Sequence, residues 1–351
     1  MKKDVFFIAD ISGFTEFVKS TEQNHSKHIV RELLEIIIKS NKLGFTLVEI
    51  EGDAIFFYGK RGTFSATDLL RQIEQSYLQF KDHLQLYESK RICPCGACTN
   101  ASKLSLKFIS HFGELDFIEI NGSKKPYGKD VILAHRLLKN DINSSSYMLF
   151  SGIDENMLSD KRDDIQWKKL TTSYDDENIK YIYSELIFLN DQVKIYRQET
   201  YSANDSFNLT RSVEVNYKPE KLLELISNFN LRLKWNKSAY DIIYDAERVN
   251  RSGEKHICVI DNKHINFETI TSDFGEGKLV YGEVTKSAAP IDELVQFFVI
   301  SETDSGSLLE TYVYFKLTNI FKKLLYPLVK IKLTKVVSQT LERIKISAES
   351  T

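Results

Sequence analysis

Two apolar runs near the N-terminus each contain an aspartate beside a turn-prone glycine. The first run, FFIADISGFT, contains Asp10, and the second, FTLVEIEGDAIFFYG, contains Asp53. Such runs predict buried strands, and the glycines predict turns at the strand ends. A strand end is a rigid support, and two carboxylates held close together suit two hard divalent cations. We therefore expect Asp10 and Asp53 to share a metal site; the alternative is that each merely caps a turn.

The first half of the chain interleaves predicted strands and helices. The order is strand, helix, hairpin, helix, strand and helix, at residues 5–9, 15–40, 45–50 with 54–58, 66–86, 104–110 and 130–139. The helices are indicated by apolar residues that recur at helical spacing. Interleaving of this kind favours an α/β or α+β sandwich.

The second half has a different pattern. At 351 residues the chain is too long for one ordinary core. A polar segment at 189–208 predicts a linker, which gives two domains, 1–188 and 209–351. The second contains a short helix among several short strands and closes with a long helix from about 319 to 348. Pro327 predicts a kink or a broken first turn in that helix.

Composition narrows the function classes. The chain is 42% apolar and 27% charged, as in soluble globular proteins. Its net charge of −2 argues against electrostatic attraction to a nucleic acid. No run reaches the ~18 to 20 apolar residues that a transmembrane segment needs. The first apolar run is too short for the core of a signal peptide. The four cysteines suit a reducing compartment, so we expect a cytoplasmic protein.

Three of the cysteines lie in one short loop. Cys93, Cys95 and Cys98 place three soft thiolate ligands within six residues. Zinc in a closed structural site takes four ligands, so this loop is a candidate Zn²⁺ site that lacks its fourth ligand. His83, Cys258 or a partner chain could supply it. The alternative is that the cysteines are redox-active or free thiols.

Four blocks of the first half resemble the class III adenylate/guanylate cyclase catalytic domain. These blocks are FFIADISGFT, EIEGDAIFFYG, LKFISHFGEL and YGKDVILAHRLLKN, and the resemblance covers roughly residues 4–185. It is closest to a divergent, uncharacterised bacterial group. The resemblance implies a ferredoxin-like, cyclase-type α/β sandwich that binds a nucleoside triphosphate with Mg²⁺ or Mn²⁺. It also implies a head-to-tail homodimer in which the site is shared between subunits.

The resemblance assigns roles to the residues around the first two blocks. Asp10 and Asp53 match the two metal-binding aspartates, and the Ile11 carbonyl matches a backbone ligand of the metal. Gly13 and Phe14 match the loop that approaches the triphosphate, where backbone N–H groups can hold anionic oxygens.

Further along, the sequence both follows and departs from the family pattern. Arg136 matches the arginine that stabilises the transferring phosphate; a plain helix-surface role is the alternative. Ile132 stands where the family has a transition-state asparagine. Glu49 and Lys125 stand at the base-selecting positions, and Glu49 is typical of guanine-selecting members. No clear triphosphate-binding lysine occurs at 174–180. Because one transition-state donor is worth about 10²–10³ in rate, losing two predicts a very slow or inactive enzyme.

The second half resembles the START-like or polyketide-cyclase-like helix-grip fold. The order of elements and the segment KPEKLLELISNFNLRLKWN carry this resemblance. It implies an apolar cavity for a lipid or another hydrophobic small molecule. Aromatic residues either line that cavity or fill an ordinary core: Trp235, Phe267, Phe274, Phe297, Phe298 and Tyr314.

The closing helix is amphipathic and basic. We expect its apolar residues to form one packing face: Ile320, Leu324, Leu328, Ile331, Val336, Leu341 and Ile344. Its lysines either form the solvated outer face of the helix or contact an anionic membrane.

Together these features predict an α+β protein with a cyclase-like domain followed by a helix-grip domain. The expected function is signalling or sensing by a weak or inactive cyclase-like unit that binds nucleotide and metal and is coupled to a hydrophobic-ligand domain. One alternative is an active guanylate or adenylate cyclase. Another is a lipid-binding or interaction protein with a vestigial cyclase fold.

Overall fold

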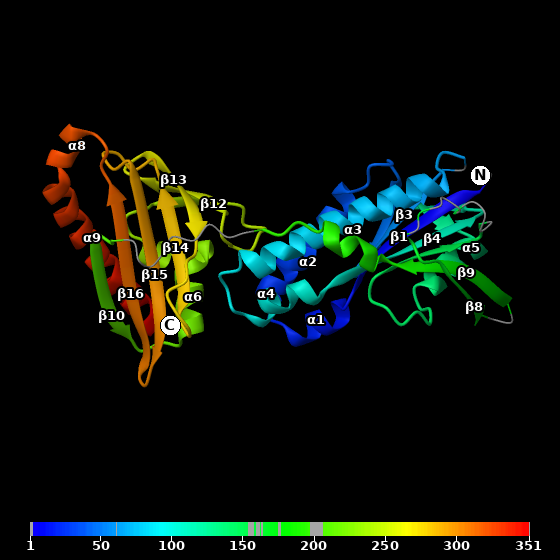
Figure 1. Ribbon diagram of the computed structural model, residues 1–351, viewed down its shortest axis with the longest axis horizontal. Coiled ribbons are helices and arrows are strands. Elements are labelled where there is room, and N and C mark those ends of the chain that lie inside the picture. Colours follow the sequence, from blue (N-terminus) through cyan, green and yellow to red (C-terminus); the bar gives the residue numbers. More distant parts are fainter. Residues whose placement is uncertain are drawn as a thin grey trace. The chain divides into compact units, whose positions relative to one another are not determined.

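The chain folds into two compact units (Figure 1). The computed structural model describes residues 3–60, 62–153, 158, 162, 164–174, 177–196 and 206–350. The first unit contains Met1–Gln85 and Asn100–Ile195, and the second contains Leu86–Thr99 and Tyr196–Thr351. Two seven-stranded sheets with helices confirm the predicted α+β class. Within the predicted linker, residues 197–205 lie outside the described residues.

The first unit is built on a mixed sheet with the strand order β2-β3-β1-β4-β7-β9-β8. Strand β1 (Asp4–Ser12) lies between β3 (Ala54–Gly59) and β4 (Ser105–Gly113) and is antiparallel to both. All of β1 except its last residue is buried, which explains its continuous apolar sequence. The remaining strands are β2 (Thr46–Glu51), β7 (Tyr147–Ser151), β8 (Lys168–Tyr174) and β9 (Glu177–Glu185).

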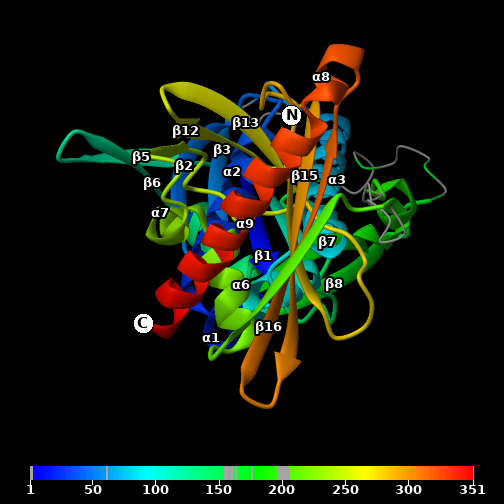
Figure 2. The same ribbon diagram turned by 90° about the vertical axis from the view of Figure 1, so that its left-hand side faces the viewer.

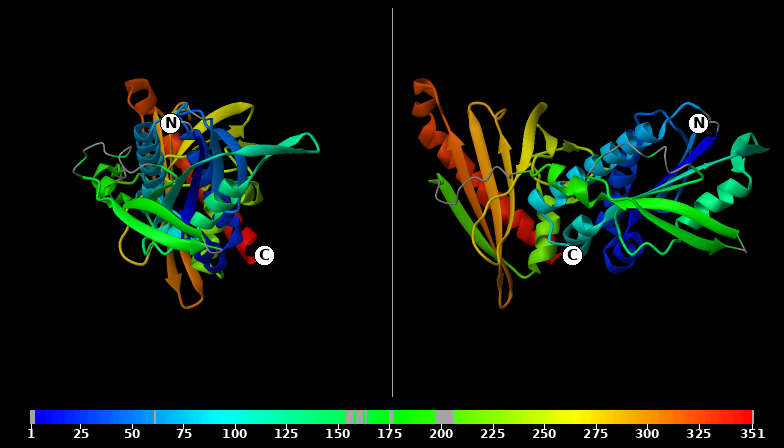
Figure 3. Two further views of the ribbon diagram at one scale, coloured as in Figure 1. Left: turned by 90° about the vertical axis from the view of Figure 1, so that its right-hand side faces the viewer. Right: turned by 45° about the vertical axis from the view of Figure 1, so that its right-hand side comes forward.

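The helix expected at 15–40 is two helices. Thr21 has extended backbone angles, so the chain breaks into α1 (Phe14–Ser20) and α2 (Gln23–Lys39). In α5 (Lys129–Leu137), Val131, Ala134 and Leu137 pack into the core with residues of β1, as helical spacing requires. The long helix α3 (Ala66–Ser89) is followed in the chain by α4 (Gly96–Asn100) and a 3-10 turn at Ala101–Lys103. The remaining elements are the hairpin β5 (Asp116–Ile120) with β6 (Ser123–Tyr127) and a 3-10 turn at Leu186–Gln192. Figure 3 shows this hairpin projecting from the first unit.

The second unit is built on an antiparallel sheet with the order β10-β16-β15-β14-β13-β12-β11. Its strands are β10 (Leu209–Val215), β11 (Asp241–Ile243), β12 (Lys255–Ile260), β13 (Lys263–Ile270), β14 (Leu279–Thr285), β15 (Glu293–Thr303) and β16 (Gly306–Lys316). The short helices are α6 (Pro219–Ser227) and α7 (Arg232–Trp235), with a 3-10 turn at Phe229–Leu231.

The closing helix is broken where Pro327 predicts it. A short α8 (Ile320–Leu324) precedes α9 (Tyr326–Glu349), and Pro327 lies in the first turn of α9, where its missing N–H costs no hydrogen bond. Figure 2 shows α9 lying across one face of the second sheet. The second unit thus contains the expected short helices among strands and the expected closing helix.

The predicted packing face of α9 is wrong. The apolar side chains that pack into the core clusters are Val329, Leu333, Val337, Leu341, Ile344 and Ala348. Of the expected set, only Leu341 and Ile344 belong to this face, whereas Ile320, Leu324, Leu328, Ile331 and Val336 are exposed. The first half of α9 is apolar on two sides, so helical periodicity alone could not select the side that packs.

The segment Leu86–Thr99 is part of the second unit. Ile92 lies in the core cluster that contains Leu222 and Leu341. The Ser252 amide donates to the Lys90 carbonyl at 2.9 Å. A stretch of chain that precedes most of the first unit's sheet therefore contributes to the core of the second.

Helix length also bears on membrane insertion. Across the described residues, we find no helix with enough length and apolar character to cross a bilayer.

Candidate functional site

Asp10 and Asp53 lie at one end of the first sheet. Asp10 is opposite Ala54 on β3, and Asp53 occupies the tight turn between β2 and β3. Gly52 has a φ of 61°, a conformation that glycine adopts without strain. The Ile11 amide donates to the Asp53 carbonyl at 3.2 Å, which ties the turn to the end of β1.

The two carboxyl groups interact. Burial, repulsion from the Asp10 carboxylate and a hydrogen bond between the two carboxyl groups together raise the pKa of Asp53 to about 6. Such a shift marks negative charge that nearby groups do not fully compensate. A site of this kind gains from a bound cation.

Lys107 is the cation next to this pair. It lies opposite Asp10 on β4, and its Nζ atom is 2.8 Å from Oδ2 of Asp10. Burial favours the neutral amine, but the Asp10 charge outweighs it, and the pKa of Lys107 lies above its usual value. This contact was not predicted from the sequence, because it depends on the register between β1 and β4.

Gly13 and Phe14 form the junction between β1 and α1. Gly13 has a φ of 86°, and its carbonyl accepts from the Phe17 amide at 3.0 Å, which starts the helix. This conformation favours glycine. Ile11 and Ser12 separate Asp10 from this junction, so its backbone N–H groups lie close to Asp10 in the chain.

Arg136 lies on the side of α5 that faces away from the core. With Ile132 and Tyr174 it lines a pocket of about 370 Å³, and neither Asp10 nor Asp53 is among the described residues that line it. The guanidinium lies 5.4 Å from the centre of the Tyr174 ring. The Tyr174 hydroxyl donates to the carbonyl of Lys139 at 2.7 Å.

The expected base-selecting residues pair with each other. Lys125 of β6 lies 3.0 Å from Glu49 of β2, and both side chains are more than 40% exposed. A nucleobase that binds these groups would have to compete with this ion pair.

The histidines of the cyclase-like blocks have structural contacts. The ring of His111 is 2.8 Å from the Ser151 hydroxyl and 3.3 Å from the Asp130 carboxylate. Burial lowers the pKa of His111, which favours the neutral ring. His135 stacks on Phe56 with ring centres 4.4 Å apart.

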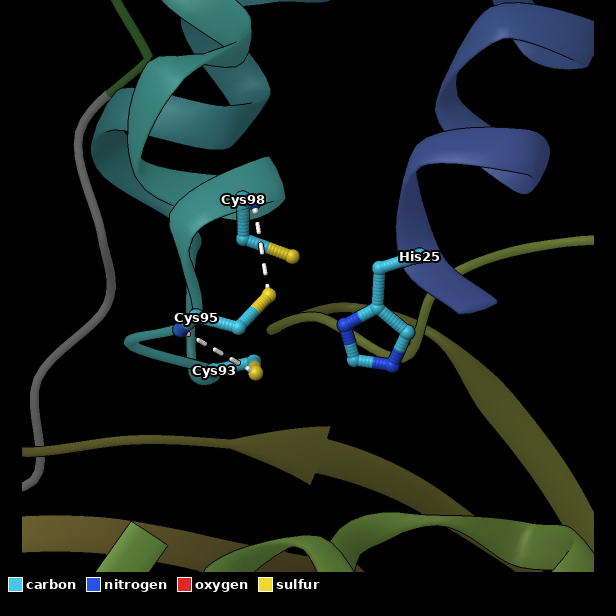
Figure 4. Close-up of side chains that lie close together, drawn as sticks. All are labelled: His25, Cys93, Cys95 and Cys98. Atoms are coloured by element: carbon cyan, nitrogen blue, oxygen red, sulfur yellow. Dashed lines mark hydrogen bonds between the residues drawn. The ribbon is translucent and has the colours of Figure 1, made fainter. Parts of the chain in front are cut away.

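The three loop cysteines gather around a common point (Figure 4). Their Sγ atoms and a ring nitrogen of His25 all lie within 4.8 Å of one another. The Cys95 amide donates to Cys93 Sγ at 3.4 Å, and the Cys98 amide donates to Cys95 Sγ at 3.5 Å. Hydrogen bonds to Cys93 and Cys95, together with burial, raise the pKa of Cys98 well above its usual value. Three thiolates therefore need a cation to coexist here.

The fourth ligands proposed from the sequence have other partners. His83 lies 2.6 Å from the Glu32 carboxylate. Cys258 is buried in an apolar cluster with Phe229 and Ile242 of the second unit. Nothing in the spacing around the loop pointed to His25, which lies far from it in sequence.

The second unit has a cavity of about 790 Å³ beside β12, β13 and β14. It is lined by apolar and charged side chains, among them Ile257, Ile270, Val284, Lys90, Lys255 and Lys286. Of the expected cavity residues, Phe267 lines it. Trp235 and Phe298 belong to the core under α9, and Phe274, Phe297 and Tyr314 belong to a different cluster.

A buried ionic cluster lies in the same unit. Arg232 pairs with the Glu283 carboxylate at 2.5 Å, the Tyr281 hydroxyl donates to Glu283 at 2.5 Å, and His256 is 3.3 Å away. Burial opposes ionisation, but the charges of Arg232 and His256 outweigh it and hold the pKa of Glu283 far below its usual value. The Arg232 guanidinium also lies 4.5 Å from the centre of the Trp235 ring.

Comparison with known proteins finds similarity over part of the chain. Residues 30–147 match a family described as a protein of unknown function (DUF2652). An uncharacterised protein of Mycobacterium tuberculosis is 33% identical over 124 residues, which are 35% of this chain and 57% of the relative. The chain thus matches little more than half the length of that relative.

Two solved structures are also similar. The adenylyl cyclase CyaB from P. aeruginosa is 16% identical with a TM-score of 0.39, over 52% of this chain and 93% of the cyclase. The catalytic core of a rhodopsin-guanylyl cyclase with converted specificity, in complex with ATPalphaS, is 15% identical with a TM-score of 0.39, over 52% of this chain and 96% of that core.

Proposed function

We propose that the first unit binds a nucleoside triphosphate together with Mg²⁺ or Mn²⁺ and acts as a divergent, slow or inactive cyclase-like module. The observation that carries this proposal is the interacting carboxyl pair of Asp10 and Asp53, with the raised pKa of Asp53. Two carboxylates on rigid strand ends match the ligand chemistry of hard divalent cations.

The residues around the pair suit this ligand. Asp10, Asp53 and the Ile11 carbonyl would hold the cation, which would neutralise the phosphate oxygens and orient them. The N–H groups that follow Gly13 would donate to those oxygens. We infer that Arg136 acts on the ligand of a second subunit in a homodimer, since it lines a pocket without the carboxyl pair.

Two features favour binding over fast turnover. Ile132 cannot donate a hydrogen bond, although it lines the same pocket as Arg136. Lys107 already neutralises part of the charge on Asp10 and thus weakens the attraction for a second cation. One missing transition-state donor costs about 10²–10³ in rate.

The test uses calorimetry to measure whether the full chain binds Mn²⁺ together with ATP or GTP. We expect Asp53→Ala to abolish binding, because it removes one of two charged ligands. The control Glu119→Ala, on exposed β5, should bind as the native chain does. Failure of every triphosphate to bind would favour the vestigial alternative. Production of cyclic nucleotide that Asp53→Ala abolishes would instead favour the active cyclase.

We further propose that the three loop cysteines hold Zn²⁺, with His25 as the fourth ligand. Three thiolates and one imidazole form a common closed, structural zinc site. Their ligand atoms lie close enough for one ion to contact all four. Such a site would stabilise the fold and would not catalyse.

Elemental analysis of the purified full chain tests the zinc proposal. We expect close to one zinc per chain, loss of zinc in Cys95→Ser, and faster loss to a chelator in His25→Ala. Cys258→Ser is the matched control, since Cys258 lies in an apolar cluster and should not affect the metal. Less than about 0.3 zinc per native chain would contradict the proposal.

For the second unit we propose a helix-grip fold that binds a hydrophobic small molecule or lipid in the cavity beside β12–β14. The support is its volume of about 790 Å³, within the range of ligand pockets. Mass spectrometry of organic extracts from the full chain should detect a bound lipid. Replacement of Val284 by Trp, which fills the cavity, should remove it; an unchanged extract would place the ligand elsewhere.

A further inference from the structure

The junction of α8 and α9 exposes a row of large apolar side chains. Each is between 64% and 75% exposed: Ile320, Phe321, Leu324, Leu328 and Ile331. Four of them recur three or four positions apart, so they follow one side of the helical segment. Figures 1 and 2 show α8 at one end of the second unit. Contiguous exposed apolar surface of this kind marks an interaction site.

The fold of the second unit does not need these side chains. The opposite side of α9 packs on the sheet through Val329 and Leu333, which lie against Phe315 and Leu317. Farther along, Val337 and Leu341 continue that face. The exposed row therefore contributes an apolar surface that packing inside the unit does not explain.

The same segment is strongly basic. Residues 319–341 contain Lys322, Lys323, Lys330, Lys332 and Lys335 and no aspartate or glutamate. Lys322 pairs with Asp292. Across the part of the chain that the structure describes, the other four lysines form no salt bridge, and Lys330 lies 5.9 Å from the centre of the Tyr326 ring. Their charge is thus available to a negatively charged partner.

We propose that residues 320–335 dock on an anionic lipid surface. The apolar row enters the boundary between head groups and acyl chains, and the lysines lie at the level of the lipid phosphates. A lipid surface fits better than a protein partner, because the apolar row lies at one end of the second unit and the charged side chains of its segment are all positive. This docking is peripheral and does not depend on the nucleotide proposal.

The test is sedimentation of the full chain with vesicles of phosphatidylcholine alone or with phosphatidylglycerol added. We expect binding only to the vesicles that contain phosphatidylglycerol, with affinity that falls as salt concentration rises. Phe321→Ser with Leu324→Ser should weaken binding at least about tenfold, because these side chains enter the membrane. Both are exposed, so the thermal unfolding temperature should stay unchanged.

Ile346→Ser is the matched control. Ile346 is also exposed on α9 but lies beyond the basic segment, so this variant should bind as the native chain does. Lys323→Gln with Lys330→Gln and Lys332→Gln should remove the preference for phosphatidylglycerol. Absence of vesicle binding, or equal binding by the Phe321→Ser, Leu324→Ser variant, would overturn the proposal. A dimer that dissociates in that variant would also overturn it and assign the row to a second copy of the chain.

Discussion

The carboxyl pair of the first unit and the ionic cluster of the second place acidic groups in opposite surroundings. Glu283 faces the Arg232 guanidinium and the His256 ring, and its pKa is lowered. Asp53 faces another carboxylate, and its pKa is raised to about 6. A buried acid that the fold itself neutralises serves stability, whereas an acid left beside a like charge suits a ligand that brings positive charge.

Removal of Arg232 is the strongest test of the difference between the two acidic groups. Arg232→Met leaves Glu283 buried without its main partner, and we expect the free energy of unfolding of the second unit to fall by about 3–5 kcal/mol. Urea denaturation followed through Trp235 fluorescence, with Trp167 replaced by Phe, measures it. Asp53→Asn should cause no such loss, since it removes a repulsion; a larger loss there would reverse the comparison.

The pH dependence of stability should separate the two units. The folded pKa of Asp53 is raised above its unfolded value of about 3.8, so its contribution to stability is present at low pH and is lost as pH rises through about 6. The folded pKa of Glu283 is lowered, so its contribution is present above about pH 4.5 and is lost as pH falls.

Calorimetry from acidic to neutral pH measures both trends. Asp53→Asn should flatten the decline of the first unit toward pH 6 and leave the acid sensitivity of the second unit intact. If the stability of the first unit still declines with rising pH in this variant, another group causes the decline, and the pKa of Asp53 is not raised as described.

Removal of Lys107 should have the smallest effect of these changes, and it tests how far a fixed cation already balances the charge of the carboxyl pair. Lys107→Met leaves Asp10 without its ion-pair partner, so the carboxyl pair should bind Mn²⁺ about fivefold more tightly, as expected for a partly screened pair. Titration of the full chain with Mn²⁺ measures it. Lys103→Met, a nearby lysine outside the pair, is the control, and weaker binding by Lys107→Met would show that Lys107 helps to hold the ligand.

Local patterns were enough to predict part of this molecule. The strands around Asp10 and Asp53 follow from apolar runs that end at glycines, and the break at Pro327 follows from the missing N–H of proline. The contact of Lys107 with Asp10 depends on strand register, which a single sequence leaves open. The packing side of α9 depends on which of two apolar faces meets the sheet.

The cysteine loop shows the same limit. Three cysteines in six residues are a local signal, and the sequence predicted a metal site there. His25 is distant in the chain, and only tertiary structure brings its ring to the thiols. The sequence instead pointed to His83 and Cys258, whose neighbours are Glu32 and an apolar cluster.

The path of the chain through residues 86–99 limits how this protein can be dissected or rearranged. A fragment that starts at Tyr196 would lack Ile92 and the backbone bond from Ser252 to Lys90, so it would leave a gap in its own interior. Gene fusions or splits at the apparent linker would damage the downstream half. The second unit is therefore expected to fold stably only when residues 86–99 are expressed with it.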